Sequence, residues 1–168
     1  ISSIGGGCTL MGIRGANNNG YMYYCDNGVA WAANNGAKII SMSWGSDESS
    51  SSEETLMQEV YENDIILIAA AGNDGDGENP IFYPAGYSSV ISVASTNSDG
   101  KLSYFSQHGP GRADIAAPGG FYIISGQYAS NILSTTYCTC QYWRLSGTSS
   151  LNGEYYDGMQ GTSMACPV

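Results

Sequence analysis

Positive charge is scarce in this sequence. Its 168 residues include 5 Lys and Arg against 15 Asp and Glu, so the formal net charge at pH 7 is −10. Proteins that bind nucleic-acid phosphates or anionic lipid surfaces do so through clustered Lys and Arg. The composition therefore excludes nucleic acid and a membrane surface as expected partners.

The sequence also lacks a long apolar run and a full share of charged residues. Its longest strongly apolar run, residues 65–71, is far too short to span a bilayer. Charged residues make up 12% of the chain, so Ser, Asn, Gly and Tyr must cover much of the surface, as is more typical of secreted proteins. The hydrophobic fraction of 42% is still enough for a folded core in a chain of this length.

Histidine is nearly absent, and cysteine occurs in an odd number. The single histidine, His108, cannot complete a His-rich metal site. Five cysteines cannot all pair within one chain: Cys8, Cys25, Cys138, Cys140 and Cys166. We expect one or two disulfides and a free buried thiol, which fits an oxidising compartment. A metal role for the cysteines is the alternative.

Strand-like and helix-like segments alternate along the first two thirds of the chain. The expected strands are 10–13, 37–45, 65–71, 90–94 and 114–117. One helix is expected to begin at Asp26 and to end before Gly36, and a second to follow a capping box of Ser51 and Glu54. This alternation predicts the α/β class: a three-layer αβα fold with a mainly parallel sheet and helices on both faces. The run 65–71 is expected to be buried on both sides.

Two polar side chains follow small-residue segments where the active site of a parallel α/β sheet is expected. Asn73 follows a buried strand in AAAGNDG, and a rigidly held Asn amide is a good donor to an oxyanion. Ser163 in GTSMA stands where a helix is expected to begin, so backbone N–H groups would surround it. Taken singly, each motif also fits an ordinary turn or a helix N-cap.

Several motifs in a fixed order resemble those of the subtilisin-like serine proteases, the subtilases. They are AAAGNDG, YPAGYSSVISVAS, FSQHGPGRADIAAPG and GTSMACP, preceded by NGVAWAANNGAKI and IISMSWGS. The likeness covers roughly residues 10–119 and 159–167. It implies a subtilisin-like fold and a secreted serine endopeptidase that acts on polypeptides and needs no cofactor for its chemistry.

The resemblance assigns a catalytic role to two residues. Ser163 would be the nucleophile that forms the acyl-enzyme, and Asn73 would form the oxyanion hole together with the backbone N–H of Ser163. The base of the family's triad is a His oriented by an Asp, in motifs of the HGTHVAG and DTG kind that do not occur here. The remaining candidates match no triad motif: His108, Asp26, Asp64 and Asp74.

The resemblance also assigns residues that bind the substrate. The segment expected to pair with an extended peptide by β-addition is Ser43, Trp44 and Gly45. A wall of the primary specificity pocket is expected from Ala70, Ala71 and Gly72. A structural calcium ion would fall near the carbonyls of Ala85, Tyr87 and Val90 and the carboxylate of Asp114, although such sites differ among subtilases.

The departures from the family lead to an expectation about domain organisation. Residues 1–168 are expected to be a partial subtilase catalytic domain, incomplete at both ends, in which 120–158 form inserted loops or hairpins. The triad Asp and His would lie outside this chain, and the missing N-terminal part of the same domain is the expected partner. The alternative is a catalytically inactive, subtilase-like scaffold or binding fragment.

Overall fold

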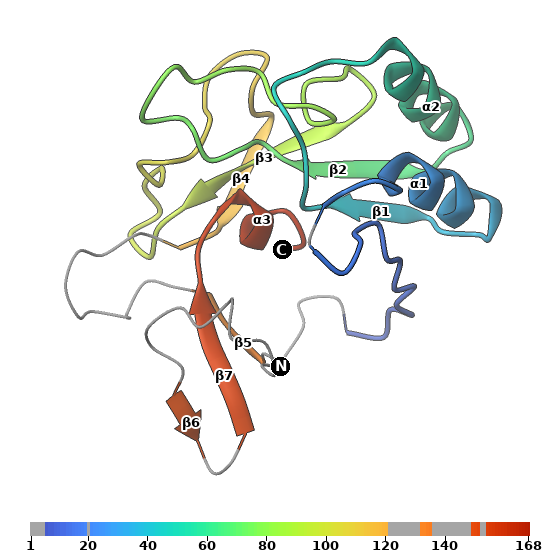
Figure 1. Cartoon of the computed structure of the whole chain (residues 1–168). Helices are drawn as coiled ribbons and strands as arrows, with labels where there is room; N and C mark the ends of the chain where they lie inside the picture. The colour runs from blue at the N-terminus through green and yellow to red at the C-terminus, as the bar shows by residue number, and fades with distance from the viewer. Residues whose placement is uncertain (1–5, 20, 121–131, 136–148, 152–153) are drawn as a thin grey trace.

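The computed structural model of the protein describes residues 6–19, 21–120, 132–135, 149–151 and 154–168. These residues form a parallel sheet with its helices and a separate antiparallel sheet (Figure 1). No helix within the described ranges is long and apolar enough to cross a lipid bilayer.

The central element is a four-stranded sheet whose order in space follows the order in the chain. Its strands are β1 (Ile39–Met42), β2 (Ile66–Ala70), β3 (Ile91–Thr96) and β4 (Ile115–Pro118), and all neighbours are parallel. Helix α1 (Cys25–Asn34) precedes β1, and α2 (Ser51–Glu62) connects β1 to β2. Since all four strands run the same way, the segments that follow them meet at one edge of the sheet.

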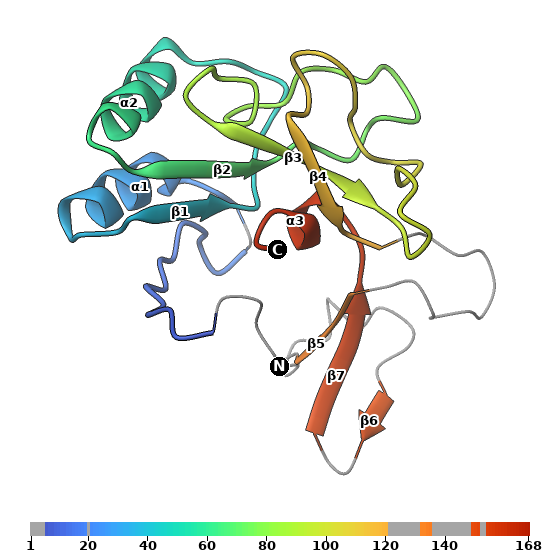
Figure 2. The same cartoon turned by 180° about the vertical axis from the view of Figure 1, so that it is seen from behind.

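Helices pack on both faces of this sheet, as predicted. The side chains of α1 and α2 form a core with one face, in which Met57 and Leu67 are almost fully buried. The short helix α3 (Thr162–Ala165) contacts β2, β3 and β4. The thiol of Cys166 lies 3.4 Å from the hydroxyl of Ser41, whose side chain points to the opposite face from that of Met42. The three-layer αβα prediction is therefore confirmed (Figures 1 and 2).

Two expectations about strands are wrong. Residues 10–13 form no strand; they are exposed, and an apolar run specifies a strand only where a neighbouring strand is available to pair with it. The run 65–71 is not buried on both sides, because α3 covers only the carboxyl-terminal part of its face. The first residue of each parallel strand is exposed on that face: Ile39, Ile66, Ile91 and Ile115.

The capping residue of α2 is one position earlier than predicted. The hydroxyl of Ser50, not that of Ser51, accepts a hydrogen bond from the backbone N–H of Glu53, at 3.5 Å. The phenol of Tyr87 is part of the same cap: it accepts from the N–H of Ser50 at 2.9 Å and donates to the Glu53 carboxylate at 2.8 Å. A residue distant in the sequence thus fixes where the helix begins.

A second sheet lies within the part of the chain where the helical pattern is lost. Strands β5 (Ile132–Thr135), β7 (Glu154–Met159) and β6 (Ser149–Leu151) pair antiparallel in that order. Figures 1 and 2 both show this sheet extending away from the parallel one, with β7 leading directly into α3. That 120–158 are an insertion relative to the family stays a prediction.

The cysteines give the predicted disulfides no support. Within the described residues, Cys8 is exposed, Cys25 is half-buried and Cys166 is buried, and all three are free thiols. Cys138 and Cys140 lie outside the described residues. The expectation of a free buried thiol is met by Cys166.

Candidate active site

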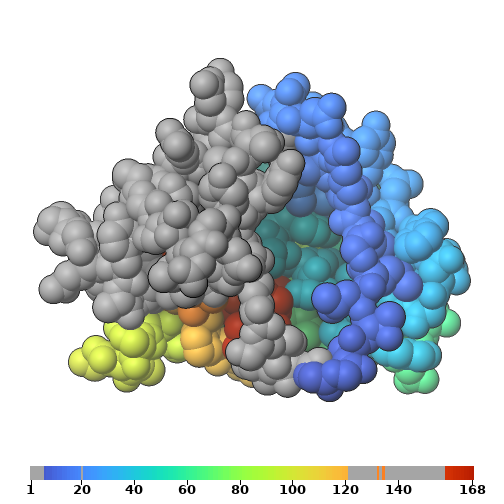
Figure 3. Space-filling view, turned by 90° about the horizontal axis from the view of Figure 1, so that it is seen from below, coloured from blue at the N-terminus to red at the C-terminus, as the bar shows by residue number. Residues whose placement is uncertain are grey.

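The predicted nucleophile, Ser163, is the second residue of α3 and lies against the segment that follows β1. Its hydroxyl donates to the carbonyl oxygen of Ser43 at 3.2 Å, and the Ser43 hydroxyl donates back to the carbonyl oxygen of Ser163 at 2.8 Å. In the view from below, residues near the C-terminus, coloured red, reach the surface, and N-terminal residues, coloured blue, flank a hollow (Figure 3). The structure thus brings Ser163 next to the predicted substrate-binding segment.

Asn73 is joined to the residue that precedes the nucleophile. Its side-chain Oδ1 accepts from the backbone N–H of Thr162 at 2.9 Å and from the Thr162 hydroxyl at 3.1 Å. The Thr162 hydroxyl in turn accepts from the N–H of Gly72 at 3.1 Å. Because Oδ1 is held by two donors, the amide presents Nδ2 as its available group, and Nδ2 has no partner among the described residues. Thr162 is a site residue that the sequence analysis missed.

Two glycines allow the chain to bring α3 close to the end of β4. The N–H of Gly161 donates to the carbonyl oxygen of Gly119 at 2.8 Å, and Gly161 has a φ of 142°. A Cβ atom on Gly119 would lie 2.3 Å from the Ser95 hydroxyl and 2.6 Å from the Gly161 carbonyl oxygen. The backbone contact that seats α3 therefore requires the absence of a side chain at this position.

The predicted substrate-binding segment has unpaired backbone groups. Ser46 pairs with Tyr83 through two backbone hydrogen bonds of 2.9 and 2.7 Å. The backbone–backbone hydrogen bonds of the described residues include none from Ser43, Trp44 or Gly45. Backbone groups without backbone partners are what an added peptide strand needs, although the carbonyl oxygen of Ser43 already accepts from the Ser163 hydroxyl. Trp44 itself is half-buried against the core.

The predicted pocket wall, Ala70, Ala71 and Gly72, is buried. Ala70 is 3% exposed and Ala71 is 0% exposed, and the N–H of Ala71 donates to Val93 at the end of the β2–β3 pairing. A Cβ atom on Gly72 would lie 2.4 Å from the side chain of Gln107. Their contact with a substrate stays a prediction.

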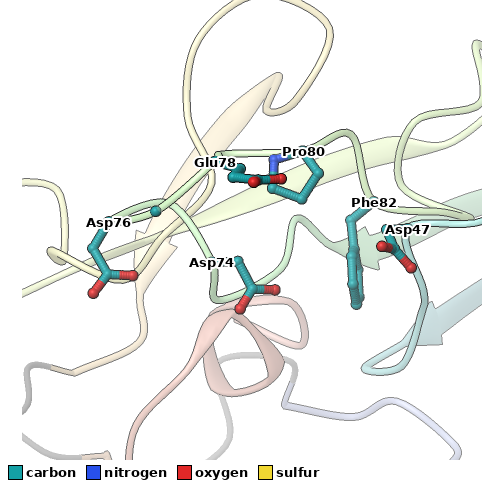
Figure 4. A pocket seen from close by; sticks show the side chains of 7 residues that line it. Asp47, Asp74, Asp76, Glu78, Pro80 and Phe82 are labelled. Carbon is teal, nitrogen blue, oxygen red and sulfur yellow. The ribbon is translucent and has the colours of Figure 1, made fainter.

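An acidic pocket opens beside these segments, and the sequence analysis did not foresee it. Its volume is about 460 Å³, and its lining is Asp47, Asp74, Asp76, Gly77, Glu78, Pro80 and Phe82 (Figure 4). Asp74 directly follows Asn73, and Asp47 lies two positions after Gly45. Within the described part of the chain these carboxylates form no ion pair. The three acidic residues within NDGDGE were the feature of the sequence that could have indicated this pocket.

No acid–base partner for Ser163 occurs in the described residues. The ring Nδ1 of His108 is bonded to the carbonyl oxygen of Ser106 at 3.0 Å, and its backbone N–H donates to Asn79. Asp26, Asp64 and Asp74 make no hydrogen bond to the Ser163 hydroxyl, which is directed at Ser43. Through Thr162 the structure brings the predicted nucleophile and the predicted oxyanion donor near each other, and no triad forms among the described residues.

Some of the residues predicted near a calcium ion already make protein contacts, and the calcium site itself stays a prediction. Oδ2 of Asp114 accepts from both the N–H and the hydroxyl of Ser92, at 2.9 and 2.8 Å, so this carboxylate bridges β3 and β4. The carbonyl oxygen of Tyr87 accepts from the N–H of Val90 at 3.0 Å. Three or more His, Cys, Asp or Glu side chains do not gather as a metal site among the residues the structure describes.

Comparison with known proteins gives a family for the chain. The pattern of the Subtilase family matches residues 2–168. The minor extracellular protease Epr of Bacillus subtilis is 38% identical over 122 residues, which are 73% of this chain and 17% of that protein. Subtilisin Savinase of Lederbergia lenta is 31% identical over 155 residues, which are 92% of this chain and 47% of that protein. The chain thus spans less than half of these curated relatives.

Solved structures show the same likeness. The psychrophilic subtilisin-like protease Apa1 of Pseudoalteromonas sp. AS-11 has a TM-score of 0.61 at 34% identity, covering 73% of this chain and 26% of that one. A protease of Pseudoalteromonas arctica has a TM-score of 0.67 at 31% identity, covering 84% of this chain and 42% of that one. Sequence and structure comparisons thus agree.

Proposed function

The chain belongs to the subtilase family, and on that basis we propose that it is part of a serine endopeptidase that cleaves peptide bonds through an acyl-enzyme on Ser163. The observation that carries the proposal is the hydrogen-bonded group at the ends of β1 and β2. There Thr162, the residue before Ser163, donates two hydrogen bonds to Oδ1 of Asn73. This arrangement directs Nδ2 of Asn73 away from its protein contacts, as a donor to an oxyanion must be.

The proposed reaction follows the general scheme of a base-activated serine. The Ser163 hydroxyl attacks the carbonyl carbon of the scissile bond as its proton passes to a histidine, and the carbonyl oxygen becomes an oxyanion. Nδ2 of Asn73 and the backbone N–H of Ser163 donate to that oxyanion. Collapse of the tetrahedral species expels the amine, which takes the proton from the histidine. Water then attacks the acyl-enzyme ester, with the same histidine as base, and releases the acid and free Ser163.

The proposal places the triad His and Asp in polypeptide outside these 168 residues, as the missing N-terminal part of the same catalytic domain. The chain covers only 17–47% of the length of the two curated relatives described above, which supports this placement. The row of exposed isoleucines at the starts of the parallel strands supports it too, because such a face is normally covered by further polypeptide. We also propose secretion, since two relatives are named as extracellular proteases.

A fluorophosphonate probe tests the proposal, because only a base-activated serine reacts with it quickly. The protein is isolated with every chain that accompanies it, treated with the probe and digested, and the labelled peptide is identified by mass spectrometry. We expect the label on Ser163 and none in Ser163→Ala, whereas Ser88→Ala, at an exposed position outside the site, should label normally. Folded protein that stays unlabelled would instead support the inactive, subtilase-like scaffold.

A further inference from the structure

A buried glutamine that is not among the predicted site residues holds the loop that carries Asn73. Gln107 is 0% exposed and lies between β3 and β4. Its side-chain Oε1 accepts from the backbone N–H of Asp74 at 2.8 Å, and its own backbone N–H donates to the carbonyl oxygen of Gly72 at 3.2 Å. One residue is therefore bonded to the chain on both sides of Asn73.

The loop of residues 72–75 packs closely against residues 105–107. A Cβ atom on Gly72 would lie 2.4 Å from Nε2 of Gln107, so the amide packs directly against the backbone there. The N–H of Gly75 donates to the carbonyl oxygen of Phe105 at 2.8 Å, and a Cβ atom on Gly75 would lie 1.9 Å from the carbonyl oxygen of Ser106. Residues 72–75 thus lie flat on residues 105–107.

The hydrogen-bonding groups of the Gln107 side chain explain why an amide occupies this position. Nε2 of Gln107 is buried and has no hydrogen-bond partner among the described residues. Turning the amide over would set its NH₂ group against the N–H of Asp74, donor against donor, so Oε1 must face Asp74. An unpaired buried donor is unfavourable, and an apolar side chain of similar size would avoid it. What Gln107 supplies, and an apolar side chain would not, is the acceptor for Asp74.

We propose that Gln107 is a positioning residue for the oxyanion donor. It fixes the peptide groups on both sides of Asn73, while Thr162 fixes the side-chain Oδ1, so that Nδ2 is held in one place without contact between Gln107 and the substrate. The inference rests on the proposed function, because it takes Asn73 as the donor. A fixed donor is needed since a displacement of about 1 Å can cost roughly a hundredfold in rate.

The activity test is a double-mutant cycle in the intact enzyme, with Gln107→Met and Asn73→Ala. Met has a similar volume and replaces the amide oxygen by a thioether sulfur, which is only a weak acceptor. We expect Gln107→Met to lower kcat by roughly 10- to 100-fold with KM unchanged, and to have little further effect when Asn73 is already Ala. Gln58→Met is the matched control, because Gln58 lies exposed on α2 and bonds only to Glu62; its kcat should equal that of the wild type.

A second measurement needs neither activity nor a variant that folds. Hydrogen exchange of the wild-type protein should show the backbone amide of Asp74 protected, and Gln107→Met, if it folds, should lose that protection. Rapid exchange of this amide in the wild type would overturn the proposal. So would independent effects of the two substitutions on kcat, even if Asn73→Ala alone is impaired and the proposed function stands. If Asn73→Ala keeps full kcat, the oxyanion role of Asn73 fails, and with it the positioning role.

Discussion

At the scale of single residues, one hydroxyl connects the two halves of the candidate active site. The Thr162 hydroxyl donates to Asn73 and accepts from Gly72, so both of its hydrogen-bonding functions are used, and the residue is 0% exposed. Its backbone N–H reinforces the same contact. Small polar residues beside a nucleophile can thus act as supports for a neighbouring donor.

Thr162→Val should therefore weaken both stability and turnover. Valine has nearly the same shape but leaves the N–H of Gly72 without its acceptor, which should cost about 1–3 kcal/mol of unfolding free energy. Urea unfolding of the intact enzyme measures this loss, and kcat should fall with it. Thr55→Val is the control, because the Thr55 hydroxyl bonds to Ser51 on an exposed surface of α2. Equal losses for the two variants would contradict the role given to Thr162.

Asn73→Ala should reduce kcat by about 10²–10³ while KM stays near its wild-type value, because the donor acts on charge that develops only in the transition state. That scale is taken from the oxyanion asparagine of subtilisin, a member of the same family, for which it was measured. Steady-state kinetics on the intact enzyme measure the reduction. Asn63→Ala, at the exposed end of α2, is the control and should keep full kcat. A rise in KM alone would show that Asn73 binds substrate and does not stabilise the oxyanion.

Ser163 and Asn73 could be proposed as site residues because each lies in a short motif whose residues are adjacent in the sequence, and their catalytic roles stay predictions. Thr162 and Gln107 could not be assigned in this way. Their hydrogen bonds join positions 89 and 33 residues apart. Such partners become visible only when α3 and the segment after β3 have been placed beside the end of β2. Sequence motifs thus indicate candidate residues such as Ser163 and Asn73. They do not indicate the residues that hydrogen-bond to the chain around Asn73, which are Thr162 and Gln107.

At the scale of elements, the start of α2 depends on a partly buried group of polar side chains. Burial raises the pKa of the Glu53 carboxyl, while the hydrogen bond from Tyr87 opposes part of that rise. Burial also raises the pKa of Tyr87 to about 12, so the phenol remains a donor to Glu53 throughout the neutral range. The net rise means that the folded state holds the proton of Glu53 more tightly than the unfolded state.

The sign of this shift gives a pH dependence. Stabilisation from Glu53 is present below its ordinary pKa of 4.5 and is lost as the pH rises through the higher pKa of the folded state. Glu53→Gln, which does not ionise, should gain stability relative to the wild type between about pH 4 and about pH 7. Unfolding free energies at both pH values measure the gain. Glu59→Gln, exposed on the same helix, is the control, and an equal gain there would contradict the explanation.

The loop after β2 offers a test of close packing at the same scale. Gly75→Ala should destabilise the protein strongly, since its Cβ would lie 1.9 Å from the carbonyl oxygen of Ser106, whereas Gly77→Ala meets nothing closer than 3.7 Å. The unfolding free energy should fall by more than about 2 kcal/mol in the first variant and by less than about 1 kcal/mol in the second. Similar values for both would show that the loop is not held against residues 105–107.

The elements themselves were largely predictable, and the errors have physical causes. The four parallel strands and both longer helices lie where apolar periodicity and glycine positions indicate. The cap of α2 shifted to Ser50 because Tyr87, distant in the sequence, bonds there. The apolar run at 10–13 found no partner strand. Local pattern thus sets the type of an element, and tertiary contacts decide its limits.

At the scale of the whole molecule, part of the excess of negative charge lies in the pocket next to Asn73. The net charge of −10 includes the four carboxylates of the pocket beside Asn73, which come from two segments of the chain: Asp47, Asp74, Asp76 and Glu78. These carboxylates are not paired within the described residues. They are also too dispersed to form a metal site, since no such group occurs in the described ranges. Their field therefore acts outward, on charged groups that approach the pocket.

This field predicts a preference for cationic peptides. A peptide with Arg before the scissile bond should have a higher kcat/KM than the same peptide with Glu there. The ratio should shrink between about 0.05 M and about 1 M salt, because screening shortens the Debye length to roughly 3 Å. Asp74→Asn combined with Glu78→Gln should reduce the ratio at low salt, whereas Asp99→Asn, on a turn that does not line the pocket, should leave it unchanged. A ratio insensitive to both salt and the double substitution would mean that selectivity comes from the shape of the pocket and not from its charge.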